Sequence, residues 1–277
     1  MTLKTALRQG TEILERAGVA DARPSAESLL CHALGRERVY LFSHPEHELT
    51  TVEWIHYGRY LHERSNGKPA QYITKRQEFW GREFRVTPAV LIPRPETEIL
   101  IEQALLARPS PRRVLDLCTG SGCIAVTLAL ELGADVTATD VSAEAVEVAR
   151  NNARALGARV TILEADLAGG VEGVFDLITA NPPYVESGEI ARLMREVREY
   201  EPRLALDGGP DGLDVWRRIE PEARRLLSPG GLLLGEFGSG QADAMLSLFP
   251  APWQGARIIH DLAGLPRAIA VRYDPGS

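Results

Sequence analysis

Short runs of consecutive apolar residues alternate, from Arg113 onward, with longer segments in which apolar residues recur every three or four positions. The short runs are typical of buried strands, and the longer segments are typical of helices with one buried face. Alternation of this kind predicts an α/β fold, a doubly wound and mostly parallel Rossmann-like sheet with right-handed crossovers. The predicted strands are 114–117, 136–139, 160–163, 175–180, 231–237, 257–260 and 266–273, and the predicted helices are 124–132, 143–156, 213–227 and 241–248.

The pattern before Arg113 is different. Residues 1–75 carry apolar positions at helical spacing, broken at Gly18 and Gly35, and predict a small all-helical domain. Residues 76–92 are rich in aromatic and β-branched side chains interrupted by Gly81 and Pro88, which predicts a linking β-hairpin. The expected domains are therefore 1–75, a helical domain that either docks a substrate or only packs, the linking hairpin 76–92, and the sheet domain 93–277.

Composition narrows the classes of protein. The 277 residues carry 31 Lys and Arg against 38 Asp and Glu, a net charge of −7, so a bulk basic surface for nucleic acid is absent and no direct nucleic-acid partner is expected. Three cysteines are too few, and wrongly spaced, for a disulfide framework or a zinc site. The first residues have no apolar signal core, and no apolar run approaches the length of a membrane span. A cytoplasmic protein without metal or membrane is expected.

The most informative stretch is Asn181-Pro182-Pro183-Tyr184, which directly follows the predicted strand 175–180. Two prolines cannot continue a strand, so the chain must leave the sheet here with a stiff backbone. Such a tip can grip a planar –NH2 group: the Asn181 amide oxygen and the Pro182 carbonyl accept its two hydrogens, and Tyr184 covers its face. The competing interpretation is an ordinary turn, because Asn-Pro is a common turn dipeptide.

Other predicted strands end in residues suited to a nucleoside ligand, at the edge where such sheets bind ligands. Gly120 and Gly122 follow the first strand and allow the backbone to approach the ligand closely. Asp140 ends the second strand, and its paired acceptors suit the two hydroxyls of a ribose. Asp166 follows the third strand and is placed to accept from an adenine amino group, with Leu167 against the ring.

The glycine loop also fits a dinucleotide-binding fingerprint, because Ala125 occupies the position of its third glycine. An NAD-dependent oxidoreductase therefore stays open at this point. Asp116, inside the strand before the loop, is unusual for that class and suits a cationic ligand such as the ammonium of S-adenosylmethionine. Asp116 could equally be a buried carboxylate that bonds to the loop, and the two interpretations are compatible.

Together these features resemble the class I S-adenosylmethionine-dependent methyltransferases. Within them, the chain is similar to the release factor glutamine methyltransferase family (PrmC/HemK) over nearly its whole length. The resemblance rests on the tip and on four further motifs, Phe79-Trp80-Gly81, Leu91-Ile92-Pro93-Arg94-Pro95-Glu96-Thr97-Glu98, Asp116-Leu117-Cys118-Thr119-Gly120-Ser121-Gly122 and Glu201-Pro202-Arg203-Leu204-Ala205-Leu206. The chain departs from the usual pattern at Cys118, where glycine is more common, and at Leu167, where some members carry an aromatic residue.

The resemblance implies an enzyme that methylates the side-chain amide nitrogen (N5) of the glutamine in the Gly-Gly-Gln motif of peptide-chain release factors 1 and 2. It implies S-adenosylmethionine as cofactor and the release factors as protein partners. A nucleic acid amino-methyltransferase, acting on adenine N6 or guanine N2 at the same tip, is the alternative. The catalytic residues expected are Asn181, Pro182 and Tyr184, and Pro183 and Arg94 are expected to join these three in holding the substrate. The cofactor-binding residues expected are Asp116, Cys118, Thr119, Gly120, Ser121, Gly122, Asp140, Asp166, Leu167 and Asn181.

Overall fold

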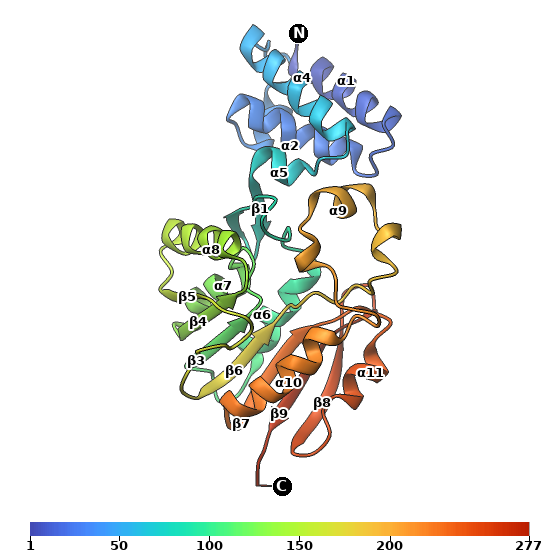
Figure 1. The fold of residues 1–277 in the computed structure, drawn as a ribbon. Coiled ribbons are helices and arrows are strands. Elements are labelled where there is room, and N and C mark those ends of the chain that lie inside the picture. Colours follow the sequence, from blue (N-terminus) through green and yellow to red (C-terminus); the bar gives the residue numbers. More distant parts are fainter. Residues whose placement is uncertain (277) are drawn as a thin grey trace. The chain divides into compact units, whose positions relative to one another are not determined.

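The computed structural model describes residues 1–276, and the chain divides into two compact units (Figure 1). One unit, here called the helical unit, contains Met1–Arg76 and also Met194–Tyr200. The other, the sheet unit, contains Gln77–Leu193 and the residues from Glu201 onward. The segment Met194–Tyr200 is thus far from the rest of its unit in sequence, which the hydrophobic pattern did not indicate.

Six helices form the helical unit: α1 (Leu3–Arg16), α2 (Ala22–Leu34), α3 (Arg38–Ser43), α4 (Thr51–Ser65), α5 (Ala70–Thr74) and α9 (Arg195–Tyr200). The start of α4 is a capping box, in which Thr50 and Glu53 each satisfy a backbone N–H of the other. Gly35 ends α2 in the left-handed conformation that favours glycine. The core of this unit surrounds the fully buried Tyr57. The longer helices follow the predicted periodicity, whereas α3, α5 and α9 have six residues or fewer and are too short to show one.

The sheet unit begins with the hairpin of β1 (Arg76–Phe79) and β2 (Arg82–Arg85). Its turn places Trp80 and Gly81 at positive φ. The strands cover only the first part of the region in which a hairpin was expected. Residues 86–94 instead form an irregular segment that leads into a 3₁₀ turn at Pro95–Thr97 and the helix α6 (Glu98–Leu106).

The main sheet has seven strands in the order β5-β4-β3-β6-β7-β9-β8. Parallel pairing joins β5 through β7, and β9 runs antiparallel to both of its neighbours. This arrangement confirms the predicted doubly wound, mostly parallel fold. The strands are β3 (Arg113–Leu117), β4 (Asp135–Asp140), β5 (Val160–Glu164), β6 (Phe175–Ala180), β7 (Leu227–Glu236), β8 (Trp253–His260) and β9 (Pro266–Tyr273).

Helices cover both faces of this sheet (Figure 1). The core on one face includes side chains from α6, α7 (Cys123–Leu132) and α8 (Ala143–Leu156), and the core on the other includes α10 (Asp214–Leu226) and α11 (Ala242–Ser247). The strand order reverses between β3 and β6, so the carboxyl ends of β3, β4, β6 and β7 meet at one edge beside the switch point. Among the helices of residues 1–276, none is long and apolar enough to cross a membrane.

Candidate active site

A cavity of about 310 Å³ opens at this edge of the sheet unit. Its walls come from the segments that follow β3, β4, β5 and β6, together with residues before α6 and near the start of α10. Ten of the residues singled out from the sequence line it, namely Arg94, Cys118, Thr119, Gly120, Ser121, Asp140, Asp166, Leu167, Asn181 and Pro183. Residues that are 87 positions apart in the chain, Arg94 and Asn181, therefore share one site.

The loop after β3 owes its shape to positive φ angles. Gly120 and Gly122 lie at φ 54° and 80°, a region that favours glycine. A Cβ on Gly122 would also lie 3.1 Å from the Cβ of Ala149, so the loop packs closely on α8. Cys118 adopts φ 57° without being glycine, which places backbone strain at the position where the sequence departs from the usual pattern.

Asp140 is the last residue of β4 and forms a hydrogen bond with the glycine loop. Its Oδ2 accepts from the backbone N–H of Gly120 (2.8 Å), and its Oδ1 accepts from that of Ser142 (3.0 Å). Burial raises the pKa of Asp140, and these backbone hydrogen bonds act in the opposite direction. A carboxylate has about four acceptor positions. These bonds therefore leave some acceptor capacity on Asp140, which lines the cavity.

Asp116 lies beneath the loop and is fully buried. Its two carboxylate oxygens accept hydrogen bonds of 2.6 Å from the hydroxyls of Thr119 and Thr179. Burial raises the pKa of Asp116 to about 6, although both threonine bonds lower it. Asp116 is outside the set of residues that line the cavity. Its position favours the bracing of the loop, and direct contact with an ammonium group stays a prediction.

Asp166 and Leu167 follow β5, which β4 and β3 separate from β6 and the tip in the sheet. Asp166 forms an ion pair with Arg218 of α10 at 2.6 Å, a partner that the sequence did not suggest. Leu167 is buried and lies at φ 49°. Both line the cavity, and their contacts with an adenine ring stay a prediction.

The side chain of Asn181 is fixed by two acceptors. Its Nδ2 donates to Oε2 of Glu236 (3.1 Å) and to Oγ1 of Thr97 (3.3 Å). Glu236 is the last residue of β7 and is only 1% exposed. Burial raises the pKa of Glu236, whereas hydrogen bonds from Thr97 and Tyr184 lower it.

Tyr184 and Pro182 do not line the cavity. The Tyr184 hydroxyl instead donates to Oε1 of Glu236 (2.9 Å), and burial raises the pKa of this phenol. Pro182, the second residue of the tip, is buried. The roles expected for the Pro182 carbonyl and the Tyr184 ring stay predictions.

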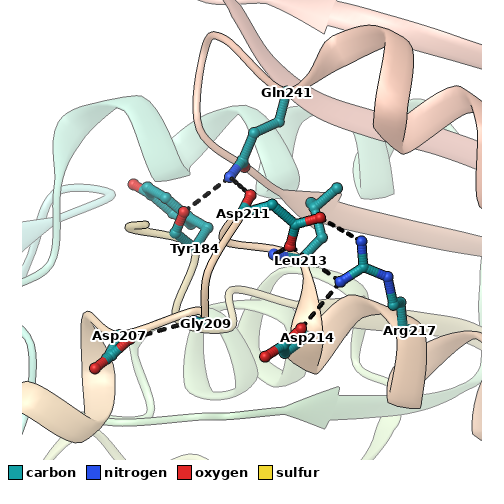
Figure 2. A network of polar contacts seen from close by, with 8 residues as sticks. All are labelled: Tyr184, Asp207, Gly209, Asp211, Leu213, Asp214, Arg217 and Gln241. Carbon is teal, nitrogen blue, oxygen red and sulfur yellow. Dashed lines mark hydrogen bonds and ion pairs between the residues drawn. The ribbon is translucent and has the colours of Figure 1, made fainter. Parts of the chain in front are cut away.

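The segment after the tip is braced by the loop 207–213. Figure 2 shows Gln241, the residue before α11, bridging the tip and this loop: its Nε2 donates to the backbone carbonyls of Tyr184 (2.9 Å) and Asp211 (3.0 Å). Asp211 in turn pairs with Arg217 of α10. A Cβ on Gly208 would lie 2.8 Å from the Pro183 carbonyl oxygen, so glycine is required there by close approach of two backbones.

Arg94 lines the cavity and is held by the buried carboxylate of Glu201. Oε2 of Glu201 also accepts from the backbone N–H of Ile92 (3.2 Å). Two of the motifs quoted from the sequence therefore meet through this ion pair. Whether Arg94 contacts a substrate stays a prediction.

Sequence reasoning missed three polar residues that shape this site. Thr97 and Glu201 lie inside the quoted motifs but were given no role. Glu236 could have been found from the sequence, because it is a carboxylate near the carboxyl end of an otherwise apolar run, Leu232–Phe237. That position is the same edge of the sheet at which Asp140 and Asn181 were expected.

Comparisons with known proteins find matches to both units of the chain. Residues 5–74 match the family described as PrmC N-terminal domain, and residues 95–209 match the methyltransferase small domain. The chain is 45% identical over 277 residues to a release factor glutamine methyltransferase of Koribacter versatilis, covering 98% of this chain and 99% of that protein. It is 44% identical over 250 residues to the protein of that name in Geobacter sulfurreducens, covering 90% and 88%. The crystal structure of a methyltransferase from Pyrococcus furiosus superposes with a TM-score of 0.53 at 21% identity, covering 74% of this chain and 94% of that one, and shows the same fold.

The relatives, together with the matched methyltransferase domain, show that the chain is an S-adenosylmethionine-dependent methyltransferase. More narrowly, the chain belongs to the release factor glutamine methyltransferase family. The site fits the cofactor of this class: it offers a glycine loop at positive φ and an aspartate that lines the cavity and keeps acceptor capacity for ribose hydroxyls. A nucleotide-dependent oxidoreductase, which the glycine loop alone left open, is no longer needed to explain the loop.

Proposed function

We propose that this protein methylates the N5 amide nitrogen of the glutamine in the Gly-Gly-Gln motif of peptide-chain release factors 1 and 2, and that it does so in the cytoplasm. The product is N5-methylglutamine. The observation that carries the proposal is Asn181, which follows β6, lines the cavity and has its amide held by Glu236 and Thr97. Family membership supplies the identity of the protein substrate.

The chemistry follows from the nature of an amide. Its nitrogen is a poor nucleophile, because the lone pair is delocalised into the carbonyl group. The cofactor supplies an electrophilic methyl group on a sulfonium. Asn181 Oδ1 and the Pro182 carbonyl would accept the two amide hydrogens, which orients the lone pair and stabilises the positive charge that develops on nitrogen. The methylated nitrogen is acidic and loses its proton to water afterwards, so no strong base is required.

Mass spectrometry tests the proposal directly. Release factor incubated with the enzyme and S-adenosylmethionine should gain one methyl group, about 14 mass units by elementary composition, on the Gly-Gly-Gln peptide and on no other peptide. A release factor in which the glutamine is replaced by asparagine should gain none, because the shorter side chain cannot bring its nitrogen to the same point. Methylation of nucleic acid with no methylation of release factor would instead favour the alternative function.

The helical unit is proposed to dock the protein substrate. It carries exposed apolar residues in helical i,i+3 pairs: Val39 and Phe42 on α3 are 72% and 54% exposed, and Val52 and Ile55 on α4 are 60% and 62% exposed. A glutamine side chain is small and common, so selection of one loop of one protein needs contacts away from the reacting atom. Apolar contacts of this kind also predict only a modest dependence on salt.

The docking role is best tested in the full chain, because removing residues 1–75 would separate Glu196 from its partner Arg64. The double variant Val39→Ser, Phe42→Ser should lower kcat/KM for intact release factor while leaving kcat/KM for a short Gly-Gly-Gln peptide unchanged. Val174→Ser, at a residue of the sheet unit that is 49% exposed, is the matched control and should change neither. Equal losses on protein and peptide would count against docking.

A further inference from the structure

Glu236 accepts three hydrogen bonds from neutral groups. Within residues 1–276, none of the ion pairs includes Glu236. Its Oε2 accepts from Thr97 Oγ1 (2.6 Å) and Asn181 Nδ2 (3.1 Å), and its Oε1 accepts from the Tyr184 hydroxyl (2.9 Å). Asn181 Nδ2 can only donate, and the hydroxyls of Thr97 and Tyr184 are both able to donate, so an ionised carboxylate satisfies all three contacts.

The direction of these hydrogen bonds determines which amide atom of Asn181, Nδ2 or Oδ1, faces Glu236 and Thr97. The single hydroxyl hydrogen of Thr97 goes to Glu236, so toward Asn181 the same oxygen can only accept. Both acceptors lie on the Nδ2 side of the amide. Rotating the amide by half a turn would place Oδ1 against a carboxylate and against a hydroxyl with no hydrogen left to give. Asn181 lines the cavity, and among the described residues none donates a hydrogen bond to its Oδ1.

We propose that Glu236 and Thr97 are positioning residues that turn the Asn181 oxygen toward the substrate, so that the site accepts an amide –NH2 and rejects a carboxylate. This inference rests on the proposed function, since it explains how glutamine is distinguished from glutamate. The two side chains have nearly the same shape, so shape alone cannot separate them. A fixed acceptor separates them strongly, because a site built for a hydrogen-bond donor leaves polar groups unpaired when an acceptor enters.

The first test measures rate. Glu236→Gln, which keeps the shape but supplies a donor of its own, should lower kcat on a Gly-Gly-Gln peptide about tenfold to a hundredfold. The dissociation constant for S-adenosylmethionine should stay within about twofold, because Glu236 is not among the residues that line the cavity. Thr97→Val should act in the same direction, and Thr97→Ser, which restores the hydroxyl, should stay near the wild-type rate. If Glu236→Gln does not fold, the Thr97 pair decides the question alone.

The second test measures selectivity, which a purely structural role would not change. Intact release factor, and a variant of it with Gly-Gly-Glu in place of Gly-Gly-Gln, compete for the enzyme in the presence of S-adenosylhomocysteine. Wild-type enzyme should prefer the glutamine form. Glu236→Gln should lose most of this preference because the Asn181 amide can then rotate, and Thr97→Val should lose less of it because Glu236 still accepts from Asn181 Nδ2. A preference that is unchanged in both variants would overturn the inference.

A double-mutant cycle completes the test. Because Glu236 is inferred to act through Asn181, adding Glu236→Gln to Asn181→Ala should slow methyl transfer no further. Slowing by the same factor as in the wild-type background would overturn the positioning role. The two proposals fail differently: wild-type enzyme that does not methylate release factor refutes the function, whereas wild-type enzyme that does, with Glu236→Gln equal to it in rate and selectivity, refutes only this inference.

Discussion

Two buried carboxylates of the sheet unit, Asp116 and Glu236, are held differently from the buried charges of the helical unit. In the helical unit, the buried Arg64 pairs with Asp21 (2.8 Å) and Glu196 (2.6 Å), and the buried Glu27 pairs with two arginines. In the sheet unit, Asp116 and Glu236 are at least as buried, yet hydroxyls and an amide hold them instead of cations. An ion pair cancels its own charge, whereas a carboxylate held by neutral donors keeps its charge directed at its surroundings. The first arrangement also occurs once at the cavity, where Glu201 pairs with Arg94, whereas the second holds the glycine loop and the tip.

The largest effect is expected at Asp116, where the carboxylate has no cation. The pKa of Asp116 is about 6 in the folded protein and near 3.8 in the unfolded chain. Between pH 3.8 and 6 the folded state therefore binds more protons than the unfolded state. Stability should therefore fall as pH rises from about 4 to 6, by roughly 3 kcal/mol at 1.36 kcal/mol per pKa unit. The loss is complete above pH 6.

Asp116→Asn removes this titration and should make the cofactor-free protein more stable than wild type above pH 6, with the difference shrinking toward pH 4. Urea denaturation of both proteins at a series of pH values measures it. Asp135→Asn, at an exposed residue of β4, should retain the wild-type profile. If the free energy of unfolding changed with pH in the same way in Asp116→Asn and in wild type, the titration of Asp116 would not be the cause of the pH dependence.

A somewhat smaller effect is expected at Arg64, where charges are paired. Arg64→Met leaves Asp21 and Glu196 without their cation, but both carboxylates reach solvent, so we expect a loss of about 2–3 kcal/mol in the free energy of unfolding. Arg59→Met, on the same helix, removes an exposed ion pair of 4.0 Å and should cost less than about 0.5 kcal/mol. Equal losses in the two variants would show that burial adds nothing to the Arg64 pair.

Asp140 tests whether a carboxylate at this edge serves a ligand as well as the loop. Asp140→Ala should weaken S-adenosylmethionine binding about tenfold to a hundredfold, since bonds to a charged acceptor contribute about 1.5–3 kcal/mol. Asp140→Asn keeps one acceptor oxygen, so its affinity for S-adenosylmethionine should lie between those of wild type and Asp140→Ala. Calorimetric affinity that is unchanged in a folded Asp140→Ala protein would remove this residue from the ribose site.

The smallest effect concerns strain and not charge. Cys118→Gly relieves a left-handed conformation that costs a non-glycine residue about 1–2 kcal/mol, but it also increases the freedom of the unfolded chain by about 0.5–1 kcal/mol. A net gain of about 0.5 kcal/mol should raise the melting temperature by a few degrees or less. Cys118→Ser keeps the strain and should show no gain.

The sequence was informative wherever local pattern decides structure. The strands and the longer helices follow from hydrophobic period, and the glycine loop, Asp140 and Asn181 follow from their places at strand ends. Bonds between distant segments could not be predicted, because no local pattern specifies them. Thr97, Asn181 and Glu236 come from three separate elements and meet only once the sheet is assembled. The same holds for Arg64 and Glu196, which lie 132 positions apart.

The bridge that Gln241 makes between Tyr184 and Asp211 has a consequence for the entropy of catalysis. The prolines of the tip have little backbone freedom, and the bridge and the close packing against Gly208 remove much of what is left. The tip is thus ordered once, when the chain folds, and not again at each turnover. A substrate amide that arrives there loses its own freedom but meets a partner that has none left to lose.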